Sequence, residues 1–147
     1  FADMRAAYED LDDKMKDIVE GLICEHSQLY SRGKIGFEDF TDEERQRFEP
    51  VRQVMVRRHP VTGRKSLYLS SHAGGIVGWP VPEARIFLQD LAEHATQRQF
   101  VHAHEWQIGD LVIWDNRQTM HRARPFPEEQ PRDMRRTTLA GDGPTVA

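Results

Sequence analysis

The sequence predicts a mostly β domain with flanking helices, in which antiparallel strands form a sandwich or barrel. Two observations support this fold class. Short strand patterns separated by turn residues crowd the last third of the chain, and only two segments carry the periodicity of a helix. Clustered strands without intervening helices favour an antiparallel arrangement over a parallel βαβ sheet. The 147 residues contain no internal repeat and no linker, so we expect one domain.

The first helix is expected at the start of the chain, where apolar residues recur at steps of three and four positions. These residues are Met4, Tyr8, Leu11, Met15, Ile18 and Leu22. Asp3 is a suitable N-cap, and Gly21 stands near the end of the pattern. The apolar stripe therefore predicts a helix that packs in the core.

The stretch from Cys24 to Pro50 loses this periodicity and mixes glycines, aromatic residues and charges. We expect a long loop there, with one short helical turn around Thr41–Phe48. Loops of this length in compact domains often form lids or walls of a functional site.

After Pro50 the pattern changes to short strands and a second helix. Val51–Arg57 predicts a strand, His59–Gly63 a turn and Ser66–Ser70 the returning strand. The second helix begins at Pro82, because proline is favoured in the first turn. Its expected buried side consists of Ile86, Phe87, Leu91 and Ala95.

Further strands follow at close spacing, separated by turns at residues 108–110 and 127–131. The predicted strands are Gln99–Trp106, Leu111–Asp115, Met120–Pro125 and Arg132–Leu139.

Composition argues against several classes of protein. No run of about 18 apolar residues is present, so we expect no membrane-spanning segment. A net charge of −4 and a sequence pI near 6.0 give no general basic surface for nucleic acid. Cys24 is the only cysteine, which excludes an internal disulfide and a cysteine-based zinc site and suits a reducing cytoplasm.

Charge is spread unevenly along the chain. Residues 1–25 hold eight acidic side chains against three basic ones, whereas residues 117–136 hold six arginines against three acids. A local excess of arginine in an acidic protein favours a small anionic ligand over a polyanion. Charge alone is equally compatible with a solvated strand surface.

Two of the seven histidines, His102 and His104, are spaced so that both rings share one face of a strand. Two imidazoles make an incomplete metal site, because a third ligand is normally required. Packing beside Trp106 is the favoured interpretation, and a metal site built on this pair is the alternative.

His121 stands in a different context, ahead of two arginines on one predicted strand. Arg132 and Arg136 share a face of that strand. Two guanidinium groups that point into one cavity repel each other unless an anion lies near them, and arginine is well shaped to bind a carboxylate with two hydrogen bonds. With His121 at one end of the cavity, the pattern suggests a metal-plus-dicarboxylate site; exposed arginines on a surface strand are the alternative.

Two segments carry a family resemblance. Residues 114–123 read Trp-Asp-Asn-Arg-Gln-Thr-Met-His-Arg-Ala, and residues 132–142 read Arg-Asp-Met-Arg-Arg-Thr-Thr-Leu-Ala-Gly-Asp. Both resemble the taurine/2,4-D dioxygenase (TauD/TfdA) family. Residues 59–68, 1–22 and 109–112 are similar to further segments of that family, so the resemblance covers essentially the whole chain. It implies a double-stranded β-helix, or jelly roll.

The resemblance also implies roles for individual residues. His121 matches the second histidine ligand of iron, and Arg132 matches the arginine that pairs with the distal carboxylate of α-ketoglutarate. Arg136 matches the arginine associated with the anionic group of the substrate and with the cosubstrate region. Trp114 and Asn116 match a framework that positions the turn of His121. His72 falls on the wall of the substrate pocket, where a histidine is closer to enzymes for aryloxyalkanoates than to those for taurine; an exposed loop histidine is the alternative.

The sequence departs from the family in one respect. The resemblance implies an iron site of two histidines and one carboxylate, yet no histidine here is followed two residues later by Asp or Glu. Residue 1 is Phe, whereas a translated chain begins with Met. We therefore expect residues 1–147 to be the C-terminal part of a single catalytic domain whose jelly roll is incomplete at the N-terminus, with one of three iron ligands.

The reaction that the resemblance implies uses Fe(II), α-ketoglutarate and O2. It releases succinate and CO2 and hydroxylates a small anionic substrate of the aryloxyalkanoate or sulfonate type. We expect a cytoplasmic homo-oligomer that binds neither nucleic acid nor membrane. The alternative function is an inactive jelly-roll module that binds an anion or mediates assembly.

Overall fold

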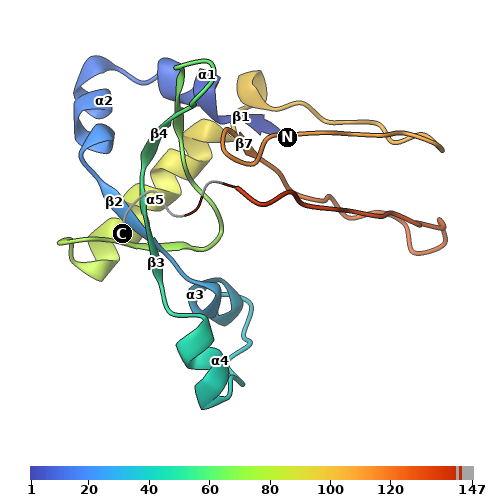
Figure 1. Cartoon of the computed structure of the whole chain (residues 1–147), viewed down its shortest axis with the longest axis horizontal. Coiled ribbons are helices and arrows are strands. Elements are labelled where there is room, and N and C mark those ends of the chain that lie inside the picture. Colours follow the sequence, from blue (N-terminus) through green and yellow to red (C-terminus); the bar gives the residue numbers. More distant parts are fainter. Residues whose placement is uncertain (142, 144–147) are drawn as a thin grey trace.

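The computed structural model describes residues 1–141 and 143. Within this range, seven short strands pair in three antiparallel sheets, and five α-helices and one 3-10 helix flank them (Figure 1). The prediction of antiparallel strands with flanking helices is confirmed. The described strands do not close into a barrel.

The start of the chain forms two helices where the periodicity predicts one. These are α1 (Met4–Glu9) and α2 (Asp13–Glu20). The side chain of Asp12 accepts a hydrogen bond from the backbone of Met15 and so caps a new helix after α1 ends. The predicted N-cap at Asp3 is confirmed, and Gly21 is the C-cap of α2.

The stretch predicted as a long loop holds regular structure, so that prediction is wrong except for its helical turn. It contains β2 (Ile23–His26) and α3 (Gln28–Gly33), and α4 (Asp42–Arg47) is the expected turn. β2 is the central strand of a sheet, between β3 (Val51–Val54) and β6 (Ala73–Ile76). Only four residues long, it is too short for a recognisable alternation.

The strand predicted at 51–57 crosses from one sheet to another. Met55, fully buried, separates β3 from β4 (Val56–Arg58). Its N–H donates to the carbonyl of Leu22 (2.9 Å), while its carbonyl accepts from the N–H of Tyr68 (2.7 Å). β4 pairs with β5 (Lys65–Leu67) around the predicted turn.

The second predicted helix is present as α5 (Val81–Ala95), which packs against β6 and α1. Leu91 and Ala95 are buried as expected, and Phe87 is partly buried. The expectation for Ile86 is wrong, because 64% of this residue is exposed. The buried side consists of Ala84, Leu88, Leu91 and Ala95.

The strands predicted after α5 form only in fragments. Arg98–Phe100 is a 3-10 helix, and the one further strand described is β7 (Thr119–Met120), which pairs with β1 (Ala2–Asp3). The predicted strands Leu111–Asp115 and Arg132–Leu139 have no ladder partner in the described part of the chain. Strand propensity does not by itself supply the partner that a ladder needs.

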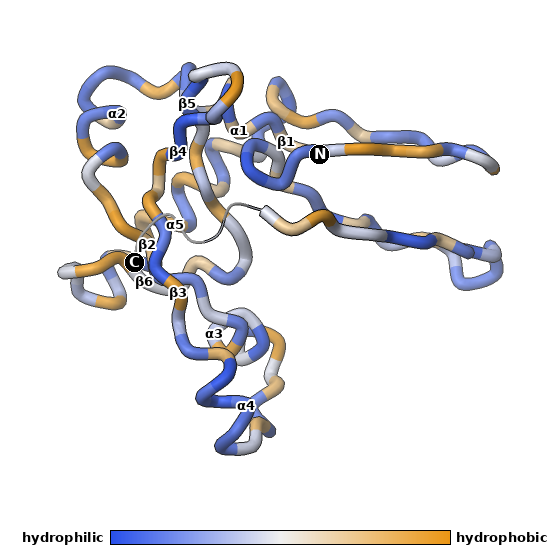
Figure 2. Tube along the Cα trace, in the orientation of Figure 1, coloured by the Kyte–Doolittle hydropathy of each residue, from blue (hydrophilic) through white to orange (hydrophobic). Residues whose placement is uncertain are grey.

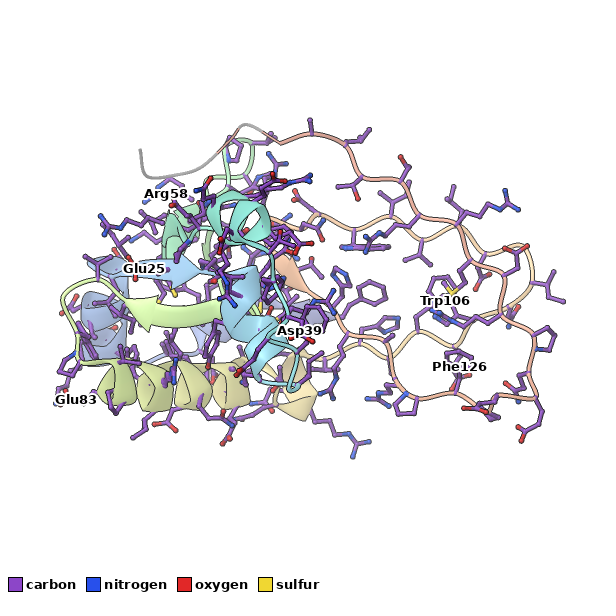
Figure 3. All side chains as sticks on the ribbon, turned by 90° about the horizontal axis from the view of Figure 1, so that it is seen from below. Glu25, Asp39, Arg58, Glu83, Trp106 and Phe126 are labelled. Atoms are coloured by element: carbon purple, nitrogen blue, oxygen red, sulfur yellow. The ribbon has the colours of Figure 1, made fainter. Side chains whose placement is uncertain are left out.

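Residues 102–118 and 121–141 instead form two projecting segments that extend from the body of the molecule (Figure 1). The predicted turns between their limbs are present. The N–H of Asp110 donates to the carbonyl of Gln107 (3.2 Å), and that of Gln130 to the carbonyl of Pro127 (3.1 Å). Apolar residues recur along the projecting segments (Figure 2), and Trp106 and Phe126 lie in them away from the helices (Figure 3).

No helix in the described range is long and apolar enough to span a membrane.

Candidate functional site

His121 lies directly after β7, where the second projecting segment begins. Its ring contacts two aromatic neighbours, with ring centroids 5.0 Å from Trp114 and 6.2 Å from Phe1. Partial burial lowers the pKa of His121, and the positive charge of Arg136 lowers it further. These surroundings favour the neutral imidazole, which is the form that binds a metal.

The turn that leads to His121 is held by residues from distant parts of the chain. The N–H of Met4 donates to the carbonyl of Gln118 (3.1 Å), and the hydroxyl of buried Ser66 donates to the carbonyl of Arg117 (3.3 Å). Within the same segment, the indole N–H of Trp114 donates to Oδ1 of Asn116 (2.8 Å). This geometry agrees with a framework role for Trp114 and Asn116.

A buried histidine completes this framework. Nδ1 of His59 accepts hydrogen bonds from the backbone N–H groups of Val61 (3.3 Å) and Thr62 (3.1 Å), so its proton is on Nε2. That nitrogen lies 3.2 Å from Oδ2 of Asp115, to which it donates. The guanidinium of Arg117 also binds Asp115 and holds the pKa of this carboxyl well below its usual value.

Arg132 and Arg136 are both exposed on the second projecting segment. Cζ of Arg132 lies 5.0 Å from the ring centroid of Phe126. The positive charge of Arg136 contributes to the lowered pKa of His121. Asp142, at the end of the second family segment, lies outside the described residues.

His72 lies in the turn directly before β6 and is exposed. Its Nδ1 lies 2.7 Å from the hydroxyl of Ser31, and its backbone N–H donates to the hydroxyl of Ser70 (3.1 Å). Since the Ser31 hydroxyl donates to the carbonyl of Gln28 (3.0 Å), its oxygen accepts the hydrogen bond from Nδ1–H of His72. No hydrogen bond, ion pair or ring contact in the described range joins His72 to His121 or the two arginines.

The residues described do not form a metal site by themselves. Nowhere in residues 1–141 and 143 do three or more His, Cys, Asp or Glu side chains gather in a way that could hold an ion. His121 is therefore one candidate ligand and not a complete site. The pair of His102 and His104 does not form a site either, because His104 binds Asp110 (2.8 Å) and packs edge-on against Trp106 with ring centroids 4.7 Å apart.

The sequence did not identify His59, Asp115 or Ser66 as residues that hold the turn before His121. Asp115 stands inside the quoted family segment, and His59 opens a predicted turn, so both were visible in the sequence. Their contact spans 56 positions of the chain, and no local pattern reports a contact at that separation.

Comparison with known proteins agrees with this geometry. The family model described as "Taurine catabolism dioxygenase TauD, TfdA family" matches residues 1–138. An alpha-ketoglutarate-dependent 2,4-dichlorophenoxyacetate dioxygenase of Burkholderia sp. (strain RASC) is 44% identical over 141 residues, which are 96% of this chain and 48% of that protein. An (S)-phenoxypropionate/alpha-ketoglutarate-dioxygenase of Delftia acidovorans is 40% identical over 96% of this chain and 50% of its own length.

A solved structure is similar over almost the whole chain. The crystal structure of AAD-2 in complex with Mn(II) and N-oxalylglycine is 62% identical, with a TM-score of 0.95 over 99% of this chain and 58% of that chain. The present chain spans about half the length of the curated relatives it matches. The match over residues 1–138, together with these identities, confirms the resemblance: the chain belongs to the taurine catabolism dioxygenase TauD, TfdA family.

Proposed function

We propose that the protein is an α-ketoglutarate-dependent, non-haem Fe(II) dioxygenase that hydroxylates small aryloxyalkanoate acids. The observation that carries this proposal is the similarity to AAD-2, whose structure contains Mn(II) and N-oxalylglycine. Identity of 40–44% to enzymes named for phenoxy acids, against 30–34% to an alkylsulfatase and a sulfate ester dioxygenase, favours the phenoxy class.

Arg132 and Arg136 are the anion-binding residues of the proposed site. N-oxalylglycine and α-ketoglutarate each carry two carboxylates, and a guanidinium binds a carboxylate with two parallel hydrogen bonds. We assign Arg132 to the distal carboxylate of α-ketoglutarate, and Arg136 to the cosubstrate region and the substrate anion. Both side chains are exposed, and neither has a carboxylate within 4.0 Å in the described range. His72 is assigned to the wall of the substrate pocket.

His121 supplies one ligand to the iron cofactor. The iron, when bound, supplies the chemistry with O2. The described residues provide neither of the other two ligands of the family's site. Because Nδ1 of His59 accepts from two backbone groups and Nε2 binds Asp115, we assign His59 to holding the turn before His121 and not to metal binding.

For the fold, we propose that residues 1–147 are the C-terminal part of one jelly-roll domain. The projecting segments support this assignment, because they are extended, carry exposed apolar side chains such as Leu111 and Ile113, and have backbone groups without ladder partners in the described range. A cytoplasmic homo-oligomer is part of the same proposal; Cys24 is buried as a free thiol, as a reducing compartment permits.

The test is α-ketoglutarate turnover by the whole protein with Fe(II) and O2. We expect succinate to form in step with phenol release from 2,4-dichlorophenoxyacetate, and much more slowly with taurine or an alkyl sulfate. Succinate formation driven best by a sulfonate or sulfate ester contradicts the substrate class. No succinate with any of these anions contradicts the enzyme.

Single substitutions in the whole protein test the residue assignments. Arg132→Ala is expected to raise the KM for α-ketoglutarate by more than tenfold, because it removes a charge-assisted bidentate contact. His121→Ala should abolish iron-dependent succinate formation. Arg124→Ala, a change on the same projecting segment, is the matched control and should leave both quantities within twofold. An unchanged KM in Arg132→Ala removes this residue from the cosubstrate site.

A further inference from the structure

His72 is exposed, yet three serines hold its polar groups in one arrangement. The backbone N–H of His72 donates to the hydroxyl of Ser70 (3.1 Å), and its carbonyl accepts from the N–H of Ser27 (2.8 Å). Its ring nitrogen Nδ1 lies 2.7 Å from the hydroxyl of Ser31. Both the backbone and the ring of this loop residue are therefore fixed by the elements around it.

The Ser31 hydroxyl decides which ring nitrogen of His72 carries the proton. It donates its one proton to the carbonyl of Gln28 (3.0 Å), so its oxygen accepts from Nδ1–H of His72. A neutral imidazole carries a single N–H, and Nε2 is then a hydrogen-bond acceptor. No hydrogen bond or ion pair within residues 1–141 and 143 involves Nε2 of His72. Nε2 is therefore the ring nitrogen left to meet a ligand.

A close approach of α3 to β6 brings Ser31 to His72. Gly74 follows His72 by two positions and has no side chain. A Cβ atom built on Gly74 would lie 2.6 Å from Cγ of Tyr30, the neighbour of Ser31 on α3. Only glycine permits this approach without movement of the tyrosine ring. The contact between Ser31 and His72 therefore depends on the packing of two elements and not on a chance meeting of surface side chains.

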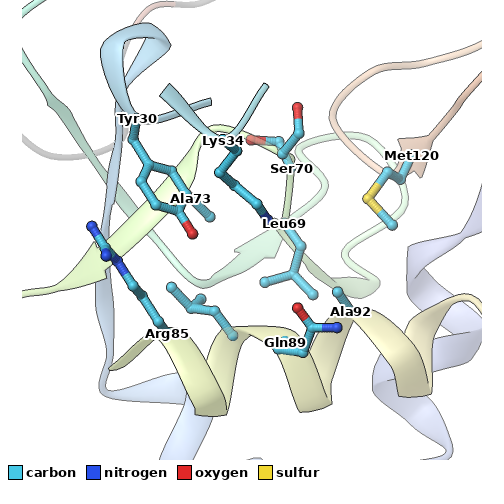
Figure 4. Close-up of a pocket in the computed structure, with 11 residues that line it drawn as sticks. Tyr30, Lys34, Leu69, Ser70, Ala73, Arg85, Gln89, Ala92 and Met120 are labelled. Carbon is cyan, nitrogen blue, oxygen red and sulfur yellow. The ribbon is translucent and has the colours of Figure 1, made fainter. Parts of the chain in front are cut away.

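The backbone anchor at Ser70 is tied to the sheet behind it. The Ser70 hydroxyl lies 3.0 Å from Nδ1 of His26 on β2, and the carbonyl of Ser70 accepts from the N–H of Ala73 (3.1 Å). Ser70 and Ala73, on either side of His72, also line a cavity of about 130 Å³ together with Tyr30 of α3 (Figure 4). The helix α3 and this turn therefore shape the cavity and orient His72 together.

We propose that Ser31 is a positioning residue for substrate binding: it holds the ring of His72 in the Nδ1–H tautomer and leaves Nε2 to meet the substrate. This role rests on the proposed function, in which His72 belongs to the wall of the substrate pocket. The neutral ring does not bind the substrate carboxylate, because an unprotonated Nε2 cannot donate a hydrogen bond; that anion is left to Arg136. Loss of the Ser31 hydroxyl therefore acts on substrate binding, and it does so through His72.

The first measurement is ¹⁵N NMR of the full 147-residue chain, labelled at its histidine rings, at about pH 8, where a histidine of ordinary pKa is neutral. His72→Gln identifies the His72 signals by their loss among those of seven histidines. We expect a protonated Nδ1 in the parent chain and in Ser31→Thr, which keeps the hydroxyl, and both tautomers in Ser31→Ala. A protonated Nε2 in the parent chain, or the parent tautomer retained in Ser31→Ala, overturns the proposal. This measurement needs neither iron nor turnover.

The second measurement is the KM of the whole protein for 2,4-dichlorophenoxyacetate. Ser31→Ala should raise this KM about fivefold, as the loss of one hydrogen bond predicts, while the KM for α-ketoglutarate stays within about twofold. In a His72→Ala background the same substitution should change neither KM, because its partner is already gone. Equal effects of Ser31→Ala in both backgrounds would show that this serine only supports the fold, and would overturn the positioning role.

Thr96→Ala is the matched control. The hydroxyl of Thr96 donates to the carbonyl of Ala92 in α5 (2.7 Å), as that of Ser31 donates within α3, and no hydrogen bond in the described range joins Thr96 to His72. Thr96→Ala should leave both KM values within about twofold. A whole protein that forms no succinate contradicts the proposed function, whereas turnover with an unchanged KM in Ser31→Ala contradicts only the role of Ser31.

Discussion

At the scale of single residues, His59 joins the turn between β4 and β5 to the segment before His121. Replacement by alanine leaves the Val61 and Thr62 amides without their acceptor and removes one partner of Asp115. We expect His59→Ala to lower the free energy of unfolding by about 2 kcal/mol, measured by urea denaturation. His102→Ala, at an exposed histidine, is the control and should change it by less than about 0.5 kcal/mol. Similar values for both variants would show that the His59 contacts contribute little.

His26 makes the free energy of unfolding depend on pH, because its imidazole is harder to protonate in the folded state than in the unfolded chain. Burial, together with the charges of His72 and Arg57, lowers its pKa to about 4. In the unfolded chain its pKa is about 6.5. Between pH 6.5 and pH 4 the unfolded chain binds a proton at His26 that the folded state does not. The contribution of His26 to the free energy of unfolding is therefore complete above pH 6.5 and is lost as the pH falls toward 4.

The measurement is the free energy of unfolding at several pH values from 7 to 5. It should fall with decreasing pH in the parent chain, and more gently in His26→Gln, whose side chain does not titrate. The difference between the two curves has an upper bound of about 3 kcal/mol near pH 4. Parallel curves would show that His26 is as easily protonated in the folded protein as in the unfolded chain.

The residues of the candidate site were predictable only where a family segment identifies them. His121, Arg132 and Arg136 come from such segments, and their roles stay predictions. The Ser31 hydroxyl beside His72 was not predictable, because it comes from a helix 41 positions away in a stretch without apolar periodicity.

At the scale of elements, α4 is stabilised by its cap and not by packing. It contains no buried residue, whereas Thr41 and Glu44 form a reciprocal capping box with hydrogen bonds of 3.2 and 2.9 Å. Thr41→Ala should destabilise this helix by about 1 kcal/mol. The measurement is amide hydrogen exchange, which should become about fivefold faster in α4 alone. Thr137→Ala, an exposed control, should leave it unchanged; equal protection of α4 in both variants would contradict the role of the cap.

The elements that the sequence predicted well are those whose signals are local. Caps at Asp3 and Thr41 and the amphipathic face of α5 act within a few residues, so α1, α4 and α5 were found. The break that Asp12 introduces before α2 and the short helix α3 were missed. Strands such as β2 and β6 were missed because pairing across the chain determines them, and β6 even contains Gly74 and Gly75.

At the scale of the whole molecule, apolar packing and backbone pairing are unevenly distributed. The buried cluster draws on α1, α5 and the sheets, while the projecting segments leave Ile108, Leu111 and Ile113 more than 80% exposed. Segments with few packed side chains and few ladder bonds open at low cost in free energy. We therefore expect a protease to cleave peptide bonds in the projecting segments before those in the packed body.

Limited trypsin digestion of the dilute chain should therefore cut after Arg122 and Arg136, in the second projecting segment, before it cuts after Arg57 or Arg64 in the body. Mass spectrometry of the first fragments makes the comparison. In the whole protein, the same sites should be cut at least tenfold more slowly, because the proposed jelly roll supplies ladder partners to these segments. First cleavage within the body would contradict the difference in local stability. Equal rates in the chain and in the whole protein would instead contradict the proposed pairing, since a covered strand is not a protease substrate until it opens.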